Sequence, residues 1–354
     1  MRAVISRIQR FRDVVRRQLG LCLFDSEKKS TLLPQNAKSI LFIRHDAKLG
    51  DAIVSSGVIR KLRQFRPDIK LKVLTSPGMY SLFKEDFLVD EVIYMKKRPS
   101  YKEIREVCRQ IGAVDMVVSL NQDMKMKDIY MLKYLQSHLN VGVDLSVKQI
   151  NLNIQKDIVH GHYAEKFDYI AKLVGISAPQ EVYIVPVKET SKARVKQFLV
   201  ARGIDRYVLL NPFGSGNERK LNAERINAIL DSIQQEQDLA VVILSSPDTR
   251  DQLATMSVEF SERVVHFDKS ESIFDAIAAV ELADLVITVD TSIVHIASGL
   301  NKPQISIYSS DKENYINWHP NSSRAFPIIS NESINNFDVS DLSISLRRII
   351  AGEF

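Results

Sequence analysis

Three short segments carry residues whose types and spacing suit group-transfer chemistry, and each of them follows an apolar run. The first is residues 44–51 (RHDAKLGD), where Gly50 permits a tight turn and Asp51 offers a carboxylate. A positioned carboxylate can accept the proton of a hydroxyl nucleophile. An aspartate at the start of a helix can also serve only as its cap. The segment by itself leaves both interpretations open.

The second segment is residues 211–220 (NPFGSGNERK), which combines two glycines, Ser215 and Lys220 ahead of a predicted helix. Backbone N–H groups, a hydroxyl and an ammonium group could converge there on phosphate oxygens. A flexible solvated loop is the alternative, because the glycine pattern alone is weak.

The third segment is residues 284–295 (DLVITVDTSIVH), where a buried strand runs into Asp290, Thr291 and Ser292. A helix containing His295 should follow, and the N-terminus of a helix favours an anion. Simple capping is the alternative for Asp290 and Thr291, and a core position is the alternative for the histidine.

The sequence lacks the motifs of several other common enzyme classes. The chain has no dinucleotide-binding glycine fingerprint, phosphate-binding P-loop, zinc-protease motif or serine-hydrolase elbow. Its two cysteines, Cys22 and Cys108, form neither a disulfide framework nor a metal cluster, and they fit a reducing cytosol.

Two runs of alternating strands and helices must position these segments. The first run predicts strands at 39–44, 71–74, 92–94, 116–119 and 141–143, with helices at 51–65, 101–111 and 162–174. The second predicts strands at 207–210, 240–244, 264–266, 284–289 and 304–308, with helices at 191–201, 223–235, 272–282, 292–300 and 339–350. Such alternation is typical of parallel α/β units, which bind ligands at the carboxyl ends of their strands. We therefore expect an α/β protein with two Rossmann-like domains facing a central cleft, at residues 38–188 and 189–354.

The N-terminal segment, residues 1–37, is expected to be a basic amphipathic arm followed by a linker. Residues 1–20 hold six arginines and one aspartate, and this excess equals the net charge of +5 of the whole 354-residue chain. Apolar residues recur at helical spacing, at Val4, Ile8, Phe11, Val15 and Leu19. The arm could lie on an anionic membrane surface, or pack on the domain with its arginines solvated. Nucleic acid is not expected as a partner, because no basic stripe with interleaved aromatic residues follows.

The chain resembles glycosyltransferase family nine, the lipopolysaccharide heptosyltransferases, from about residue 38 to residue 320. The likeness rests on three motifs: Leu49-Gly50-Asp51, His162-x-x-Glu165-Lys166-x-x-Tyr169, and Asp290-Thr291-Ser292-x-x-His295 with Pro303 after it. The chain departs from the family pattern in having Ser292 where a glycine is frequent. It also has Asn222-Ala223 where a Trp-Pro pair is common.

The resemblance implies a GT-B fold and an inverting transfer of heptose from ADP-heptose to the inner core of lipopolysaccharide, without metal or cofactor. The phosphorylated glycolipid acceptor would place the enzyme in the cytoplasm, peripherally associated with the inner membrane. Asp51 would be the catalytic base. Lys96, Lys97 and Arg98 fall where the family has basic acceptor contacts, although a solvated loop would also explain them. Donor contacts would come from Ser215, Gly216, Lys220, Asp251, Asp290, Thr291, Ser292 and His295.

Two other classes of function remain open. The first is an enzyme with a different nucleotide-sugar donor, or a nucleotide-sugar epimerase. The second is a non-catalytic sugar-binding protein. ADP release that depends on an acceptor would separate transfer from the other two.

Overall fold

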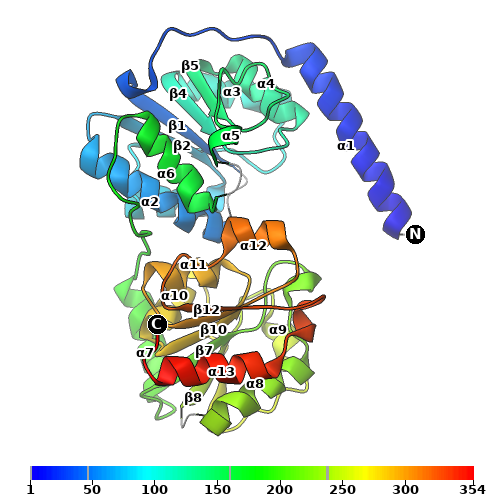
Figure 1. Cartoon of the computed structure of the whole chain (residues 1–354), viewed down its shortest axis with the longest axis vertical. Coiled ribbons are helices and arrows are strands. Elements are labelled where there is room, and N and C mark those ends of the chain that lie inside the picture. Colours follow the sequence, from blue (N-terminus) through cyan, green and yellow to red (C-terminus); the bar gives the residue numbers. More distant parts are fainter. Residues whose placement is uncertain (1, 46–47, 159–160, 237–238) are drawn as a thin grey trace. The chain divides into compact units, whose positions relative to one another are not determined.

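The computed structural model describes residues 2–45, 48–158, 161–236 and 239–354, with the backbone alone for residues 2–10. The chain divides into two compact units, Met1–Glu181 and Val182–Phe354 (Figure 1). Among the described helices, none has the length and apolar character needed to cross a membrane.

Unit 1 is built on a six-stranded sheet in the order β3-β2-β1-β4-β5-β6, with every pair of strands parallel. This is the Rossmann order, in which the chain reverses direction across the sheet between β1 and β4. Its strands are β1 Ser39–Arg44, β2 Lys70–Thr75, β3 Glu91–Tyr94, β4 Ala113–Ser119, β5 Gln136–Gly142 and β6 Leu152–Asn153. Its helices are α1 Arg2–Phe24, α2 Leu49–Phe65, α3 Tyr101–Ile111, α4 Met126–Tyr134, α5 Gln155–Ile158 and α6 Tyr163–Leu173.

Both faces of this sheet are covered, because successive side chains of β1 point to opposite sides. Leu41 belongs to the core that includes residues of α3 and α4. Phe42 instead faces Phe167 of α6, with ring centroids 6.5 Å apart. The helices α2 and α6 pack against each other on that second face.

A buried ion pair joins α2 to α6. The Lys61 ammonium is fully buried and pairs with Asp168, and it also donates a hydrogen bond of 2.7 Å to the carbonyl oxygen of Ala178. A charge in this position needs both partners, since burial removes its hydration. The pair therefore fixes the two helices relative to each other.

Helix α1 packs on α4 through its C-terminal half. The Arg17 guanidinium makes two hydrogen bonds of 2.8 Å to the buried carboxylate of Asp144. Gly20 lies so close to Met126 that an added Cβ would be 2.9 Å from the Met126 Cα. The segment that follows α1 is also held on unit 1, because Asp25 accepts hydrogen bonds from two backbone N–H groups of the loop after β5.

Unit 2 repeats the same architecture. Its sheet has the order β12-β11-β10-β7-β8-β9, again parallel throughout. The strands are β7 Tyr207–Asn211, β8 Ala240–Leu244, β9 Val264–Phe267, β10 Leu285–Val289, β11 Gln304–Tyr308 and β12 Ala325–Ile329. The helices are α7 Glu189–Val200, α8 Ala223–Glu236, α9 Arg250–Ala254, α10 Ile273–Leu282, α11 Ser292–Gly299, α12 Lys312–Trp318 and α13 Val339–Ile350. The predicted α/β class is confirmed.

Some predicted bounds need correction. The strand expected at 141–143 is β5, which begins five residues earlier at Gln136. Helix α1 ends at Phe24, beyond the arm expected from residues 1–20. The sequence-based prediction missed α4, β6, α5, α9, α12 and β12.

We predict that Asp168→Ala strongly destabilises unit 1, because it leaves the Lys61 charge buried without its carboxylate. The free energy of unfolding should fall by about 3–5 kcal/mol, measured by urea denaturation. Lys38→Ala is the matched control, since it removes an exposed ion pair with Asp68 and should hardly shift the unfolding midpoint. Equal stability of Asp168→Ala and the wild type would show that the pair does not hold α2 on α6.

Candidate active site

Asp51 lies in the first turn of α2, at the carboxyl end of β1. The helix begins at Leu49, and the N-cap position is Lys48, with an extended backbone and no side-chain cap. The aspartate is therefore the third residue of the helix and not its N-cap. Its Oδ2 lies 3.9 Å from the Arg44 Nη2, and 27% of the side-chain surface of Asp51 is exposed to solvent. The carboxylate is thus reachable from solvent and has a cation beside it.

Arg44 is a site residue that the sequence reasoning did not assign. Its side chain is only 11% exposed, and its guanidinium lies 5.1 Å from the centre of the Phe167 ring. Within the described part of the chain, its Nε and Nη2 are buried without a hydrogen-bond acceptor. Buried donors almost always have an acceptor, so this guanidinium is well suited to an anionic group. A signal was present, because an arginine that ends a buried strand at its carboxyl end must lie at the ligand-binding edge.

Lys96, Lys97 and Arg98 are exposed in the loop after β3. The Lys96 Nζ is 2.6 Å from Glu103 Oε1. Strand β3 is the edge of the sheet and lies two strands from β1. The basic triplet is therefore separated from the Asp51 loop by roughly 10 Å of sheet width.

In unit 2, residues 212–221 form a tight loop after β7. Phe213 and Lys220 pair as an antiparallel bridge, and the Gly214 N–H donates to the Arg219 carbonyl at 2.7 Å. Gly216 at the tip has φ +97°, a conformation that favours glycine. Ser215 and Gly216 are exposed at this tip.

Lys220 lies between this loop and α9. Its Nζ donates to the side-chain oxygen of Gln252 at 2.9 Å, and the neighbouring Asp251 is exposed in the same helix. The loop after β7 therefore meets the helix that follows β8. The sequence reasoning missed Gln252.

Asp290 is buried and is held by two side chains. Arg219 Nε lies 3.3 Å from its Oδ2, and the Asn314 side-chain amide donates to the same oxygen at 2.8 Å. An added Cβ on Gly214 would be 3.1 Å from Thr291 Cγ2, so the loops after β7 and β10 touch. The structure thus brings the second and third candidate segments together.

Thr291 is the N-cap of α11, so the capping interpretation is correct for this residue. Its Oγ1 accepts from the Ile293 N–H at 3.2 Å and from the Asn211 amide at 3.0 Å. Ser292 begins the helix. This N-terminus of α11 lies at the same sheet edge as Lys220, where the dipole of the helix would stabilise an anion.

His295 lies inside unit 2 and not on the loop surface. It is 4% exposed, with its ring centroid 5.8 Å from that of Trp318 and 6.5 Å from that of Tyr183. Burial, together with the nearby His319, lowers the pKa of His295 to about 3. The imidazole is therefore neutral at physiological pH and brings no positive charge to the site.

A family model described as glycosyltransferase family 9 (heptosyltransferase) matches residues 105–341. Among curated proteins, the chain is 23% identical over 328 residues to the "Putative lipopolysaccharide heptosyltransferase 4" of Escherichia coli (strain K12), covering 89% of this chain and 88% of that protein.

Two solved structures resemble this one at 17% identity. A family 9 glycosyl transferase from Veillonella parvula DSM 2008 matches with a TM-score of 0.74, over 92% of this chain and all of that chain. An E. coli ADP-heptose lps heptosyltransferase II matches with a TM-score of 0.68, over 89% of this chain and 99% of that chain. These likenesses confirm the predicted GT-B fold.

We predict that acid destabilises unit 2 through His295. The unfolded chain binds a proton on this residue below about pH 6.5, whereas the folded chain does not until about pH 3. Stability should therefore fall as the pH decreases from 6.5, by up to about 1.4 kcal/mol per pH unit. Urea denaturation between pH 7 and 5 should show a steeper loss for the wild type than for His295→Gln. Parallel pH curves for the two proteins would contradict the prediction.

Proposed function

Since the chain belongs to glycosyltransferase family 9 and is a glycosyltransferase, we propose that it transfers heptose from ADP-heptose to the inner core of lipopolysaccharide. The proposal rests on one observation, which is that the two units carry different chemical groups. Unit 1 offers a solvent-accessible carboxylate, and unit 2 gathers cations and helix N–H groups at one sheet edge. Similarity to a solved ADP-heptose lps heptosyltransferase supports the donor and the acceptor class.

The proposed reaction is a single displacement with inversion. The acceptor oxygen attacks the anomeric carbon of heptose, its proton passes to Asp51, and the bond from that carbon to the diphosphate breaks. A hydroxyl is a weak nucleophile, so loss of its proton to a base is required. One carboxylate is sufficient, because no covalent intermediate forms.

The leaving diphosphate gains negative charge as this bond breaks. In the proposal, Lys220 and the first turn of α11 stabilise that charge without a metal ion. Ser215 and Gly216 would contact the diphosphate from the loop tip, Asp251 the ribose, and Asp290 the sugar. Arg219 and Asn314 already hold the Asp290 carboxylate, so both would position it for that contact.

We propose that α1 attaches the enzyme to the cytoplasmic face of the inner membrane. Its packed face is held by Arg17 and Gly20, whereas apolar side chains point into solvent at Phe11, Val14, Val15, Leu19 and Leu23. Phe11 is 72% exposed. Arg12 and Arg16 are exposed on the same helix. An anionic bilayer would cover the apolar side chains and attract the arginines.

The reaction itself is tested by ADP release. We predict that the wild type releases ADP from ADP-heptose only when a core acceptor is present. Mass spectrometry should show one heptose missing from the core of a deletion strain. Turnover without an acceptor would indicate epimerisation or hydrolysis, and an intact core would exclude the proposed step.

Two variants should then differ in whether they affect ADP binding. Asp51→Asn should lower kcat about 10²–10⁴-fold while ADP binding stays within a few-fold, because the base does not contact the nucleotide. Lys220→Met should weaken ADP binding about tenfold or more and also lower kcat. Lys269→Ala, an exposed lysine of the same unit, is the control. If Lys220→Met had normal ADP binding and kcat while Arg219→Ala lost both, the phosphate contact would have to be assigned to Arg219 instead.

The membrane proposal predicts weaker vesicle binding without loss of soluble turnover. Arg12→Gln with Arg16→Gln should lower the affinity for anionic vesicles roughly 30-fold, since each arginine contributes about 1 kcal/mol. Phe11→Ser with Leu19→Ser should also weaken binding, and high salt should weaken it further. Val200→Ser, an exposed valine of α7, is the control. These substitutions spare Arg17, whose deletion would leave the Asp144 carboxylate buried and unpaired.

A further inference from the structure

Four aromatic rings meet where the C-terminal end of α1 lies on α3 and α4. The centroid of the Phe24 ring in α1 lies 4.9 Å from that of Tyr130 and 6.1 Å from that of Tyr101. The Tyr130 ring in turn lies 4.7 Å from Tyr101 and 4.6 Å from Tyr134. In Figure 1, α1 lies beside α4 at this junction. The rings therefore join three helices of unit 1 in one aromatic cluster.

Helix packing explains only the inner part of this cluster. Tyr130 is buried, as expected for a ring that holds helices together, whereas Tyr101 is 36% exposed and Tyr134 is 38% exposed. A tyrosine has an apolar body and a polar tip, so it suits a place that is apolar on one side and wet on the other. Tyrosines are enriched for this reason where a membrane meets water.

Cations accompany the rings at the surface. Three of them lie 5.6 Å from a ring centre: Lys133 over Phe24, Lys127 over Tyr101 and Arg105 over Tyr134. An aromatic face attracts a positive charge, so the rings hold these cations in place. Helices α3 and α4 together carry five lysines or arginines and three carboxylates. One of those carboxylates, Glu103, pairs with Lys96 at 2.6 Å. The surface therefore has an excess of positive charge.

The cluster continues the exposed face of α1. Leu23 is exposed beside Phe24, and its carbonyl oxygen accepts a hydrogen bond of 3.3 Å from Lys133. The helix is also held firmly on unit 1, because the Arg17 guanidinium makes two hydrogen bonds to the Asp144 carboxylate. A flat partner that covers the apolar side chains of α1 therefore also reaches the edge of the cluster.

The cluster adjoins the ligand-binding edge of the sheet as well. Helix α3 follows the carboxyl end of β3, and α4 follows that of β4. Tyr101 is the first residue of α3, and Lys127 in the first turn of α4 donates a hydrogen bond of 2.5 Å to the Pro99 carbonyl oxygen. Strand β4 pairs with β1, whose loop leads to Asp51. A membrane on the cluster would therefore border the edge of the sheet that carries Asp51.

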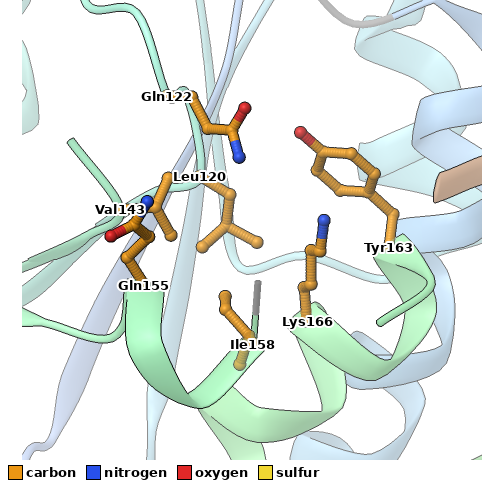
Figure 2. A pocket seen from close by; sticks show the side chains of 7 residues that line it. All are labelled: Leu120, Gln122, Val143, Gln155, Ile158, Tyr163 and Lys166. Atoms are coloured by element: carbon orange, nitrogen blue, oxygen red, sulfur yellow. The ribbon is translucent and has the colours of Figure 1, made fainter. Parts of the chain in front are cut away.

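The hollow at the carboxyl ends of β4 and β5 is too small to take part in such a contact (Figure 2). Its volume is about 10 Å³, which is room for about one water molecule. A lipid headgroup cannot enter it. The contact with a membrane therefore depends on the exposed surface of α1, α3 and α4.

We propose that an anionic bilayer binds a second surface of unit 1 besides α1, here called the α3–α4 surface: Tyr101, Arg105, Lys127, Lys133 and Tyr134. The tyrosine rings would lie among the lipid headgroups, and the three cations would pair with lipid phosphates. The inference rests on the proposed function, since it names the part of unit 1 that meets the membrane bearing the acceptor. Two contacts, unlike one helix, fix which face of unit 1 turns toward the bilayer.

Vesicle co-sedimentation of the full chain tests the charge of the α3–α4 surface. The vesicles contain phosphatidylethanolamine with phosphatidylglycerol, and vesicles of phosphatidylcholine alone are the neutral comparison. Arg105→Gln with Lys133→Gln should lower the affinity for the anionic vesicles roughly 30-fold, since two cations are lost from the contact. Lys38→Gln with Lys172→Gln removes the same charge from exposed sites outside this surface and should change the affinity by less than about threefold.

Tryptophan fluorescence tests whether the tyrosines enter the headgroup layer. The chain has one tryptophan, Trp318 of unit 2, so the signal added by Tyr134→Trp arises from the α3–α4 surface itself. Brominated phosphatidylglycerol should quench most of that added signal. Phe65→Trp, at a similarly exposed position at the end of α2, is the control and should show little quenching.

Unchanged vesicle affinity of Arg105→Gln with Lys133→Gln, or equal quenching of Tyr134→Trp and Phe65→Trp, would overturn the proposal. Urea unfolding checks that the variants fold, as expected for exposed side chains. Neither binding measurement needs donor or acceptor. A protein that binds vesicles through the α3–α4 surface but never releases ADP would therefore keep this surface and exclude the proposed reaction. Normal ADP release on a soluble acceptor, beside unchanged vesicle affinity of the double variant, would keep the reaction and exclude the surface.

Discussion

The parallel order of both sheets is the constraint on which the rest of the structure depends. In each unit the strand order reverses once, between β1 and β4 and between β7 and β10. The loops that leave these strands must diverge toward opposite faces, so side chains placed there are not covered by a crossover helix. Asp51, the loop ending at Lys220 and the first turn of α11 all lie at these two points. One topological rule therefore positions the chemistry of both units.

Much of this fold could be predicted, because its signals are local. Strand β1 and helix α13 have the predicted bounds, since each is an apolar pattern enclosed by polar residues. Strand β5 was expected to be short because it begins with Gln136, Ser137 and His138, which are polar. Strand β12 contains Pro327, and it is tolerated only because the strand lies at the sheet edge. Such context-dependent elements cannot be recognised before the neighbouring strands are known.

The sequence allowed us to predict which loops form the candidate site. It did not allow us to predict which side chains contact one another there. The sequence places Asp51, Lys220 and Asp290 after apolar strands, and the structure confirms that placement. It cannot show that Arg219 pairs with Asp290, 71 residues away, or that Arg44 lies over Phe167, because those contacts depend on packing. The motif containing His295 likewise gives no measure of burial. The sequence shows which chemical groups a loop carries, whereas the tertiary fold determines which side chains those groups contact.

The buried pair between Lys61 and Asp168 has a consequence for the proposed base. It locks α2, which carries Asp51, to α6, so a contact deep inside unit 1 sets where the carboxylate stands. A substitution that loosens the pair would let α2 shift against α6, and Asp51 would lose its alignment with a bound hydroxyl. Turnover and the stability of unit 1 would then fall together, although Lys61 is fully buried.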